Sequence, residues 1–261
     1  MSLLSLFESK PRATDWPATL SDLRVELKIE ERTERGYDTR DAVYASIHAV
    51  LRHAKGRDIE RGDARLEVNG VPLEFRVRTG NYYDRYPYYH LPESSPLTVT
   101  PGTVYRFVLI APDGTRHALG EVTTPAALQM EQIAFPRQRP VNGPVVIAWK
   151  DLAEPARLTM FRSDFRREAD GNEVHVAGSA NDPAALRREI GGGLIRRRSG
   201  DWTIAPDFLA NREGLALETL GAEVRVEHAG RMEKTFAKES SIQATRLLIL
   251  RMEFSPPQAA R

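Results

Sequence analysis

Apolar and charged residues alternate strictly over residues 23–30, and this alternation limits what the chain can fold into. A period of two places the apolar set on one face of a β-strand and the charged set on the other, so the pattern predicts a half-buried strand. The apolar members are Leu23, Val25, Leu27 and Ile29. Residues 43–51 alternate in the same way, although alanine and leucine, with the arginine that follows at position 52, also favour a helix.

Turn residues separate further predicted strands in the first half of the chain. Asn69 and Gly70 lie between two short apolar segments, and this dipeptide supplies the two positive φ angles of a type I′ hairpin turn. Residues 104–123 predict a second hairpin, with its turn at the Ala-Pro-Asp-Gly segment 111–114. With a short strand near 97–99, about seven strands fit into about 105 residues, which is the size of a β-sandwich.

The second half of the chain begins another series of predicted strands with residues 145–149. One helix is predicted within this series: Asp182 is its N-cap, Pro183 its first residue, 184–190 its body, and the glycines at 191–193 end it. We therefore expect a mainly β protein of two tandem β-sandwich domains, the second elaborated with this short helix. The expected boundaries are an N-terminal arm or leader at 1–20, β-sandwich domain 1 at 21–125, β-rich domain 2 at 126–255 and a tail at 256–261.

Residues 99–105 (Val-Thr-Pro-Gly-Thr-Val-Tyr) resemble the corner that enters strand F of fibronectin type III domains. In this corner Pro101 and Gly102 turn the chain between sheets, and Tyr105 packs inward while its hydroxyl bonds to the backbone. The strand that ends at Trp149 resembles strand B of the same superfamily, which ends in a core tryptophan. The resemblance is to the fold of immunoglobulin and fibronectin type III-like domains, and it implies a protein that binds, spaces or scaffolds.

Five of the eight tyrosines lie within residues 81–90, a segment that we predict to be a loop between two strands. Tyrosine offers a large rigid contact surface with a polar end, which is why interfaces favour it, and a flat aromatic strip also stacks on sugar rings. The alternative is internal, with the tyrosines covering the end of the sandwich or meeting the second domain. The candidate binding residues are Tyr82, Tyr83, Tyr86, Tyr88, Tyr89, Arg85 and His90.

Charge and cysteine content exclude several classes of protein. The 37 basic and 36 acidic residues are spread evenly over both halves, so no concentrated basic face is expected and no nucleic-acid partner. The absence of cysteine excludes disulfides and thiol chemistry. The six histidines lack the spacing of simple metal sites, and the Asp-Gly-Asn-Glu segment 170–173 is explained by a hairpin turn. We expect no metal and no cofactor.

Catalytic motifs are not found in the sequence either. There is no Gly-x-Ser-x-Gly nucleophile elbow, and the glycines at 191–193 lack the Gly-Lys-Ser/Thr ending of a phosphate loop. The arginine run 196–198 has two interpretations, a contact with an anion or partner and a solvated strand end. We assign no catalytic residue.

No apolar run reaches the roughly 18–20 residues that span a bilayer, so we expect no transmembrane segment. The start, MSLLSLF, lacks the basic region and cleavage site of a complete signal peptide. The domain type favours the periplasm, the cell envelope or the extracellular space, and the cytoplasm is the alternative.

Three functional hypotheses follow from the sequence. The first is a non-catalytic binding or scaffolding protein of the cell envelope or surface, in contact with a protein or polymer partner. The second is a carbohydrate-binding or enzyme-accessory module that uses the tyrosine-rich segment. The third is a hydrolase with a site at the domain interface, where ligand pockets often lie.

Overall fold

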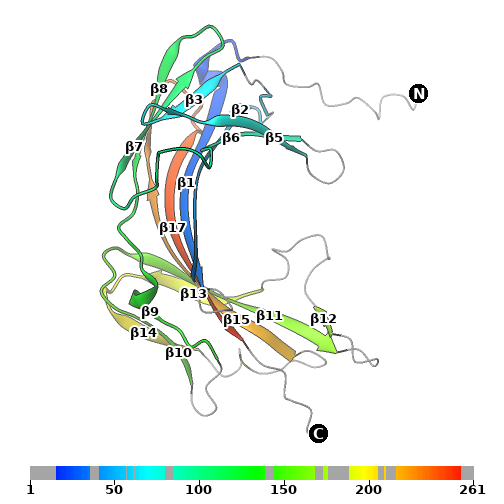
Figure 1. Ribbon diagram of the computed structural model, residues 1–261, viewed down its shortest axis with the longest axis vertical. Helices are drawn as coiled ribbons and strands as arrows, with labels where there is room; N and C mark the ends of the chain where they lie inside the picture. Colours follow the sequence, from blue (N-terminus) through cyan, green and yellow to red (C-terminus); the bar gives the residue numbers. More distant parts are fainter. Residues whose placement is uncertain are drawn as a thin grey trace, which may run out of the picture. The chain divides into compact units, whose positions relative to one another are not determined.

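The described part of the chain consists mainly of β-strands (Figure 1). The computed structural model describes residues 16–35, 41–56, 58–60, 63–79, 85–138, 144–167, 173–175, 188–204, 209 and 216–253. Within these ranges the only helical elements are two 3₁₀ turns, η2 (Leu20–Asp22) and η4 (Met130–Gln132), and no helix is long and apolar enough to cross a bilayer. The predicted mainly β class is confirmed.

The strands form three sheets in the described part of the chain. The nine-stranded sheet has the order β12-β11-β15-β17-β1-β2-β6-β5, with β13 also paired to β11. The three-stranded sheet has the order β14-β10-β9, and the five-stranded sheet has the order β16-β8-β7-β3-β4. The bounds are β1 (Leu23–Arg35), β2 (Asp41–His53), β3 (Arg65–Val68), β4 (Val71–Pro72), β5 (Glu74–Thr79), β6 (Arg85–His90), β7 (Val104–Ile110), β8 (Arg116–Thr123), β9 (Ile133–Ala134), β10 (Val145–Trp149), β11 (Ala156–Arg167), β12 (Glu173–His175), β13 (Arg188–Ile195), β14 (Gly200–Ile204), β15 (Ala216–Ala229), β16 (Arg231–Met232) and β17 (Ser241–Glu253).

The chain divides into two compact units that each draw on three stretches of sequence. Unit 1 comprises Met1–Glu30, Ala45–Thr124 and His228–Thr245, and unit 2 comprises Glu31–Tyr44, Pro125–Glu227 and Arg246–Arg261. These units differ from the two consecutive domains, 21–125 and 126–255, that we expected. The physical reason is strand length: β1, β2, β15 and β17 have 13 or 14 residues each, and every one of them contributes residues to both units.

Unit 1 has its own apolar core between two layers of strands. The predicted alternation on β1 is confirmed, since its apolar residues from Leu23 to Ile29 are at most 2% exposed. Residues 41–53 form a strand rather than a helix. The core side chains that face β1 and β2 come from β3, β7 and β8: Leu66, Val68, Tyr105, Phe107, Leu109, Leu119 and Val122.

Two hairpins organise the five-stranded sheet of unit 1. Asn69 and Gly70 have φ angles of 49° and 79°, as a type I′ turn requires, and β4 lies at the edge of the sheet, where Pro72 needs no hydrogen-bonding partner. The turn between β7 and β8 is closed by a 2.8 Å hydrogen bond from Gly114 N to Ala111 O. The expected strand at 97–99 is not formed.

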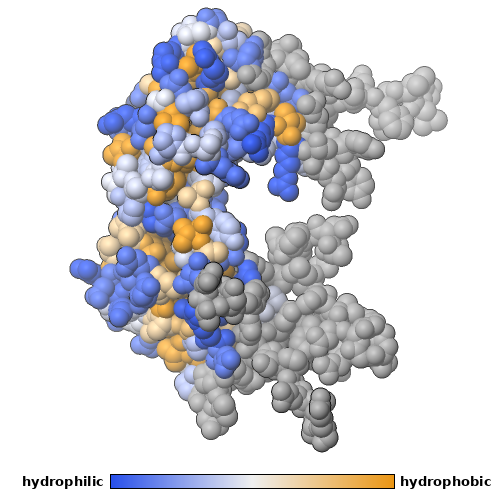
Figure 2. Space-filling view, viewed as in Figure 1, coloured by the Kyte–Doolittle hydropathy of each residue, from blue (hydrophilic) through white to orange (hydrophobic). Residues whose placement is uncertain are grey.

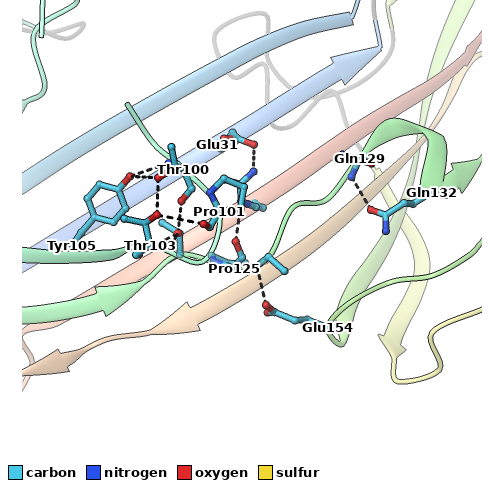
Figure 3. Close-up of polar contacts among 12 residues, drawn as sticks. Glu31, Thr100, Pro101, Thr103, Tyr105, Pro125, Gln129, Gln132 and Glu154 are labelled. Carbon is cyan, nitrogen blue, oxygen red and sulfur yellow. Dashed lines mark hydrogen bonds and ion pairs between the residues drawn. The ribbon is translucent and has the colours of Figure 1, made fainter. Parts of the chain in front are cut away.

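The backbone near Thr98 bonds to a side chain instead of a neighbouring strand. Tyr105 is 1% exposed, and its hydroxyl donates to Thr98 O at 2.7 Å and accepts from Thr100 N at 2.9 Å (Figure 3). Thr124 closes the corner by donating its hydroxyl to Thr100 O at 2.6 Å. Gly102 has a φ of 62°, which favours glycine at the turn beside Pro101.

Unit 2 has a second core between its part of the large sheet and the three-stranded sheet. Its members include Ile147, Leu158, Met160, Leu220, Val224 and Leu250. Two arginines of unit 2 are buried, Arg162 and Arg246. Arg246 pairs with Glu31 and donates from Nε to Pro125 O at 3.1 Å (Figure 3). Because both the charge and the Nε donor have partners, this arginine is tolerated inside unit 2.

The predicted helix of the second half is wrong where the structure describes it. Residues 188–190 belong to strand β13, which continues through the glycines expected to end the helix, and residues 182–187 lie outside the described residues. β13 pairs antiparallel with β11, from Ala156 opposite Ile195 to Arg162 opposite Arg188. This pairing overrides a local sequence preference that favours a helix only weakly.

Candidate functional site

Residues 85–90 of the tyrosine-rich segment are a strand, not the predicted loop. This strand, β6, pairs along its whole length with β5, from Glu74 opposite His90 to Thr79 opposite Arg85. Aromatic residues fit such a half-buried, paired position well, which explains the correction. Tyr82 and Tyr83 lie outside the described residues, as does the side chain of Arg85.

The alternation along β6 separates the candidate tyrosines into two groups. Tyr89 is 2% exposed, its hydroxyl donates to Ala64 O at 2.9 Å, and its ring centroid lies 5.2 Å from that of Phe75. Burial raises the pKa of Tyr89 above its ordinary value, so Tyr89 is a neutral core residue. Tyr86 and Tyr88 lie on the opposite face of β6, where Tyr86 is half exposed.

A groove opens on this outer face because β2 changes its pairing partner. β2 pairs with β6 at only two positions, His48 opposite His90 and Ala49 opposite Tyr89. The next residues of β2 bond to a different segment: Ile59 N donates to Leu51 O at 3.0 Å, and Arg52 forms a bridge with Asp58. β2 and β6 therefore separate, and the groove between them has a volume of about 800 Å³.

The charges that line the groove balance. Its charged lining residues are Arg52, Arg78, Asp58 and Glu93. Arg52 donates from Nε to Asp58 Oδ1 at 2.8 Å and from Nη1 to Glu26 Oε1 at 2.9 Å. The hydrogen bond with Asp58 raises the pKa of Arg52 and outweighs the opposing effect of burial. These contacts fix the positions of Arg52 and Asp58, and the four charged lining residues together give the groove no excess of either sign.

Two histidines face each other across the β2–β6 pair. Burial, followed by the positive charge of Lys28, lowers the pKa of His48 from 6.5, and Glu30 opposes this shift. His48 is therefore mostly neutral at neutral pH and offers one donor and one acceptor nitrogen. His90 donates from Nδ1 to Leu91 O at 3.0 Å, and its Nε2 lies 3.3 Å from Glu74 Oε2, a contact that lacks hydrogen-bond geometry.

The strands beside the groove arrange its side chains in rows. On β5, Arg78 lies opposite Tyr86 and Arg76 opposite Tyr88, so a row of charged residues borders the tyrosine row. On the other side the groove is lined by His48, Val50 and Arg52 of β2. Two aromatic rings with hydrogen-bonding groups on both sides can stack on a flat ligand and bind its polar edge.

The described residues include no group of three or more side chains that could hold a metal ion. Large exposed apolar side chains are also few there, namely Val43, Tyr44, Tyr86 and Leu194. On the face shown in Figure 2, hydrophobic residues lie singly or in small groups among hydrophilic ones. Scattered apolar residues are normal on a protein surface, so the groove, rather than a broad apolar patch, is the candidate site.

Sequence reasoning missed the β2 side of this groove. The alternation over 43–51 does place His48 and Val50 on one face, and extending it adds Arg52. However, it does not show that β6, some forty residues later in the chain, is their neighbour. Trp149, the other singled-out aromatic residue, is in unit 2, half-buried against that core, with its Nε1 donating to Arg197 O at 3.0 Å.

Comparison of the sequence with models of protein families finds no match, and comparison with curated proteins finds none either. The functional argument therefore rests on the geometry of the groove.

Proposed function

We propose that the protein is a non-catalytic binding protein, and that the groove of unit 1 binds a segment of an uncharged polysaccharide. The observation that carries this proposal is the row of Tyr86 and Tyr88, bordered on both sides by polar groups of balanced charge. Sugar rings present a flat apolar face and a polar edge of hydroxyls, which match the tyrosine rings and the neighbouring arginine, carboxylate and imidazole groups.

The charge balance of the lining supports a neutral ligand over a polyanion. A nucleic acid or an acidic polysaccharide requires an excess of basic groups, because neutralising the ligand's charges dominates its affinity. In this groove each arginine is matched by a carboxylate, and the lowered pKa of His48 keeps that side chain mostly uncharged. Hydroxyl groups can donate to the carboxylates and accept from the guanidinium groups without a net charge.

The proposal extends to the fold and to the location of the protein. The corner at Tyr105 supports an immunoglobulin or fibronectin type III-like sandwich for unit 1, since its hydroxyl bonds to the backbone upstream as in that superfamily. Domains of this kind are common at the cell envelope and outside the cell, where polysaccharides occur, and we propose that location. Fractionation of cells producing the native full-length protein tests it, and recovery only in the cytosol would contradict it.

A binding experiment with matched tyrosine variants tests the function. We expect the wild-type protein to bind neutral glycans on an array, and the double variant Tyr86→Ala, Tyr88→Ala to bind about tenfold more weakly or worse in calorimetry. Tyr44→Ala is the control, because Tyr44 is comparably exposed at 57% but does not line the groove. Equal affinity of the double variant, or a preference for acidic glycans, would contradict the proposal.

A further inference from the structure

Unit 2 contains a second opening, next to strand β13, whose chemistry differs from that of the groove. This pocket has a volume of about 380 Å³ and is lined by residues of β13, the following loop and two tryptophans, Trp149 and Trp202. Both tryptophans are half-buried against the core of unit 2. The pocket is thus an opening into the apolar interior of unit 2.

The pocket exists because glycine occupies an inward position of β13. Gly193 lies opposite Leu158, and side chains of directly opposed residues in an antiparallel pair point to the same face. Leu158 is 4% exposed and belongs to the core, so position 193 is on the same face of the sheet as this core residue, while Gly193 itself is exposed where the pocket opens. A Cβ atom built on Gly193 would meet no atom within 4 Å, which shows that the space for a side chain is open.

The loop after β13 holds three arginines in a fixed backbone conformation, and two of them, Arg196 and Arg197, line the pocket. Three hydrogen bonds fix this loop: Trp149 Nε1 donates to Arg197 O at 3.0 Å, Leu152 N to Arg198 O at 2.9 Å, and Asp151 N to Ser199 Oγ at 3.1 Å. The side chains of residues 196–198 are exposed, and they form no ion pair with any residue that the structure describes. Asp201 is the single acidic residue among the pocket's lining residues.

The outer edge of β13 offers backbone groups beside the pocket. β13 is paired with β11 on one side, and no described strand pairs with its other side. Gly192 and Gly193 have no side chains to shield this edge, and Leu194 is 58% exposed. An unshielded edge of this kind can accept a further strand through backbone hydrogen bonds, while pockets for alternate side chains select its sequence.

We propose that unit 2 binds an extended, acidic peptide segment of a partner protein, which pairs with the edge of β13 and inserts one apolar side chain into the pocket at Gly193. The open position at Gly193 leaves space for the apolar side chain of the peptide. The three exposed arginines can pair with acidic residues on either side of it. This site is separate from the groove in its residues and its ligand, and it does not depend on the proposed polysaccharide binding.

A fluorescent peptide tests this proposal. The probe is a labelled nine-residue peptide in which valine and phenylalanine alternate with glutamate and aspartate. One control peptide carries lysine in place of the acidic residues, and another carries serine in place of the apolar residues. In fluorescence polarisation we expect the acidic peptide to bind at least tenfold more tightly than either control, and its affinity to fall severalfold from about 0.05 M to about 0.5 M NaCl.

Variants of unit 2 distinguish the contribution of the pocket to peptide binding from that of the arginines. Gly193→Leu fills the pocket from within and should weaken peptide binding at least tenfold, with an unfolding temperature no lower than that of the wild type. Arg196→Glu should weaken binding severalfold. Arg225→Glu is the matched control, since Arg225 is exposed in unit 2 but does not line the pocket, and its affinity should equal the wild-type value.

Tryptophan emission gives a second, local measurement. The chain has three tryptophans, so Trp16→Phe leaves only the two at the pocket as emitters. Peptide binding should change their emission, and filling the pocket with Gly193→Leu should abolish the change. Equal peptide affinity of wild type and Gly193→Leu would overturn the proposal. A wild-type dimer that Gly193→Leu dissociates would also overturn it, because the occupant would then be a second copy of the chain.

Discussion

The groove of unit 1 and the pocket of unit 2 are both openings beside strands of the large sheet, yet they arise in opposite ways. The groove forms where β2 leaves β6 for the segment at Asp58, and polar and aromatic side chains fill its walls. The pocket forms within a continuous pairing, where Gly193 contributes no side chain to an apolar core. A change of strand partner therefore makes a polar surface site, whereas a missing side chain exposes the interior.

The largest expected loss of stability comes from substituting one glycine in each unit. A Cβ on Gly120 in unit 1 would lie 2.0 Å from Arg231 O, and one on Gly192 in unit 2 would lie 2.2 Å from Leu158 O. Both glycines also have a φ above 140°. We expect Gly120→Ala and Gly192→Ala each to lower the free energy of unfolding by about 3 kcal/mol or more.

Hydrogen exchange would show where each of these glycine variants loses protection. Gly120→Ala should lose protection mainly in unit 1, and Gly192→Ala mainly in unit 2. Gly193→Ala is the control, because its new Cβ meets no atom, and it should be neutral or stabilising by a few tenths of a kcal/mol. Equal loss of protection in both units from either variant would show that the two cores do not unfold separately.

The next largest expected effect is a change in the affinity of each site for its own ligand. The double variant Tyr86→Ala, Tyr88→Ala should lose glycan affinity by about tenfold and retain peptide affinity, and Gly193→Leu should do the reverse. Raising the salt concentration should leave glycan binding nearly unchanged and weaken peptide binding, because only the pocket has an excess of positive charge. Calorimetry of all four protein–ligand combinations tests this, and one variant losing both ligands would refute two independent sites.

Two buried tyrosines of unit 1 donate from their hydroxyls to backbone oxygens of different segments. Tyr105→Phe removes the bonds to Thr98 O and from Thr100 N, and should destabilise unit 1 by about 1–2 kcal/mol. Tyr89→Phe removes the bond to Ala64 O and should cost about 1 kcal/mol. Denaturant unfolding measures both, and an unchanged midpoint in Tyr105→Phe would remove the argument for a corner held by its hydroxyl.

The smallest expected effect is a pH dependence that His48 gives to unit 1. The pKa of His48 is lowered from 6.5, so the unfolded chain binds this proton more tightly than the folded chain. The contribution of His48 is therefore fully present above pH 6.5 and is lost as the pH falls through the lowered pKa. We expect thermal unfolding of His48→Gln to vary less over this window than that of the wild type.

A second histidine serves as the control for the pH effect. His117→Gln changes a half-buried histidine on β8 of the same unit that does not line the groove, so it controls for the loss of a histidine as such. If His48→Gln and His117→Gln both follow the wild type, the charge balance of the groove does not depend on a neutral His48.

Local patterns in the sequence predicted those elements whose cause is local. The strict alternation from Leu23 to Ile29 directly encodes the two faces of β1, and Asn69-Gly70 encodes a turn because both residues tolerate a positive φ. The helix at 184–190 was predicted from capping signals that are equally local, but the pairing of Arg188–Ile195 with β11 outweighed them. A short segment of sequence does not indicate such long-range pairing.

The candidate site was only partly predictable for the same reason. The concentration of tyrosines identified Tyr86, Tyr88 and His90, which line the groove, but not that Tyr89 points into the core. Arg52, Asp58 and Arg78 come from three other segments, and their proximity depends on where β2 changes its partner. The division into units was equally hidden, because alternation shows that a strand exists but not that it continues from one core into another.

At position 193, the heat resistance of unit 2 and ligand binding in its pocket favour different residues. A larger apolar residue at this position would enter the open pocket, where its Cβ meets no steric conflict. Selecting random variants of this protein for heat resistance alone should therefore enrich replacements at position 193, and the survivors should be more robust proteins that no longer recruit a partner through β13.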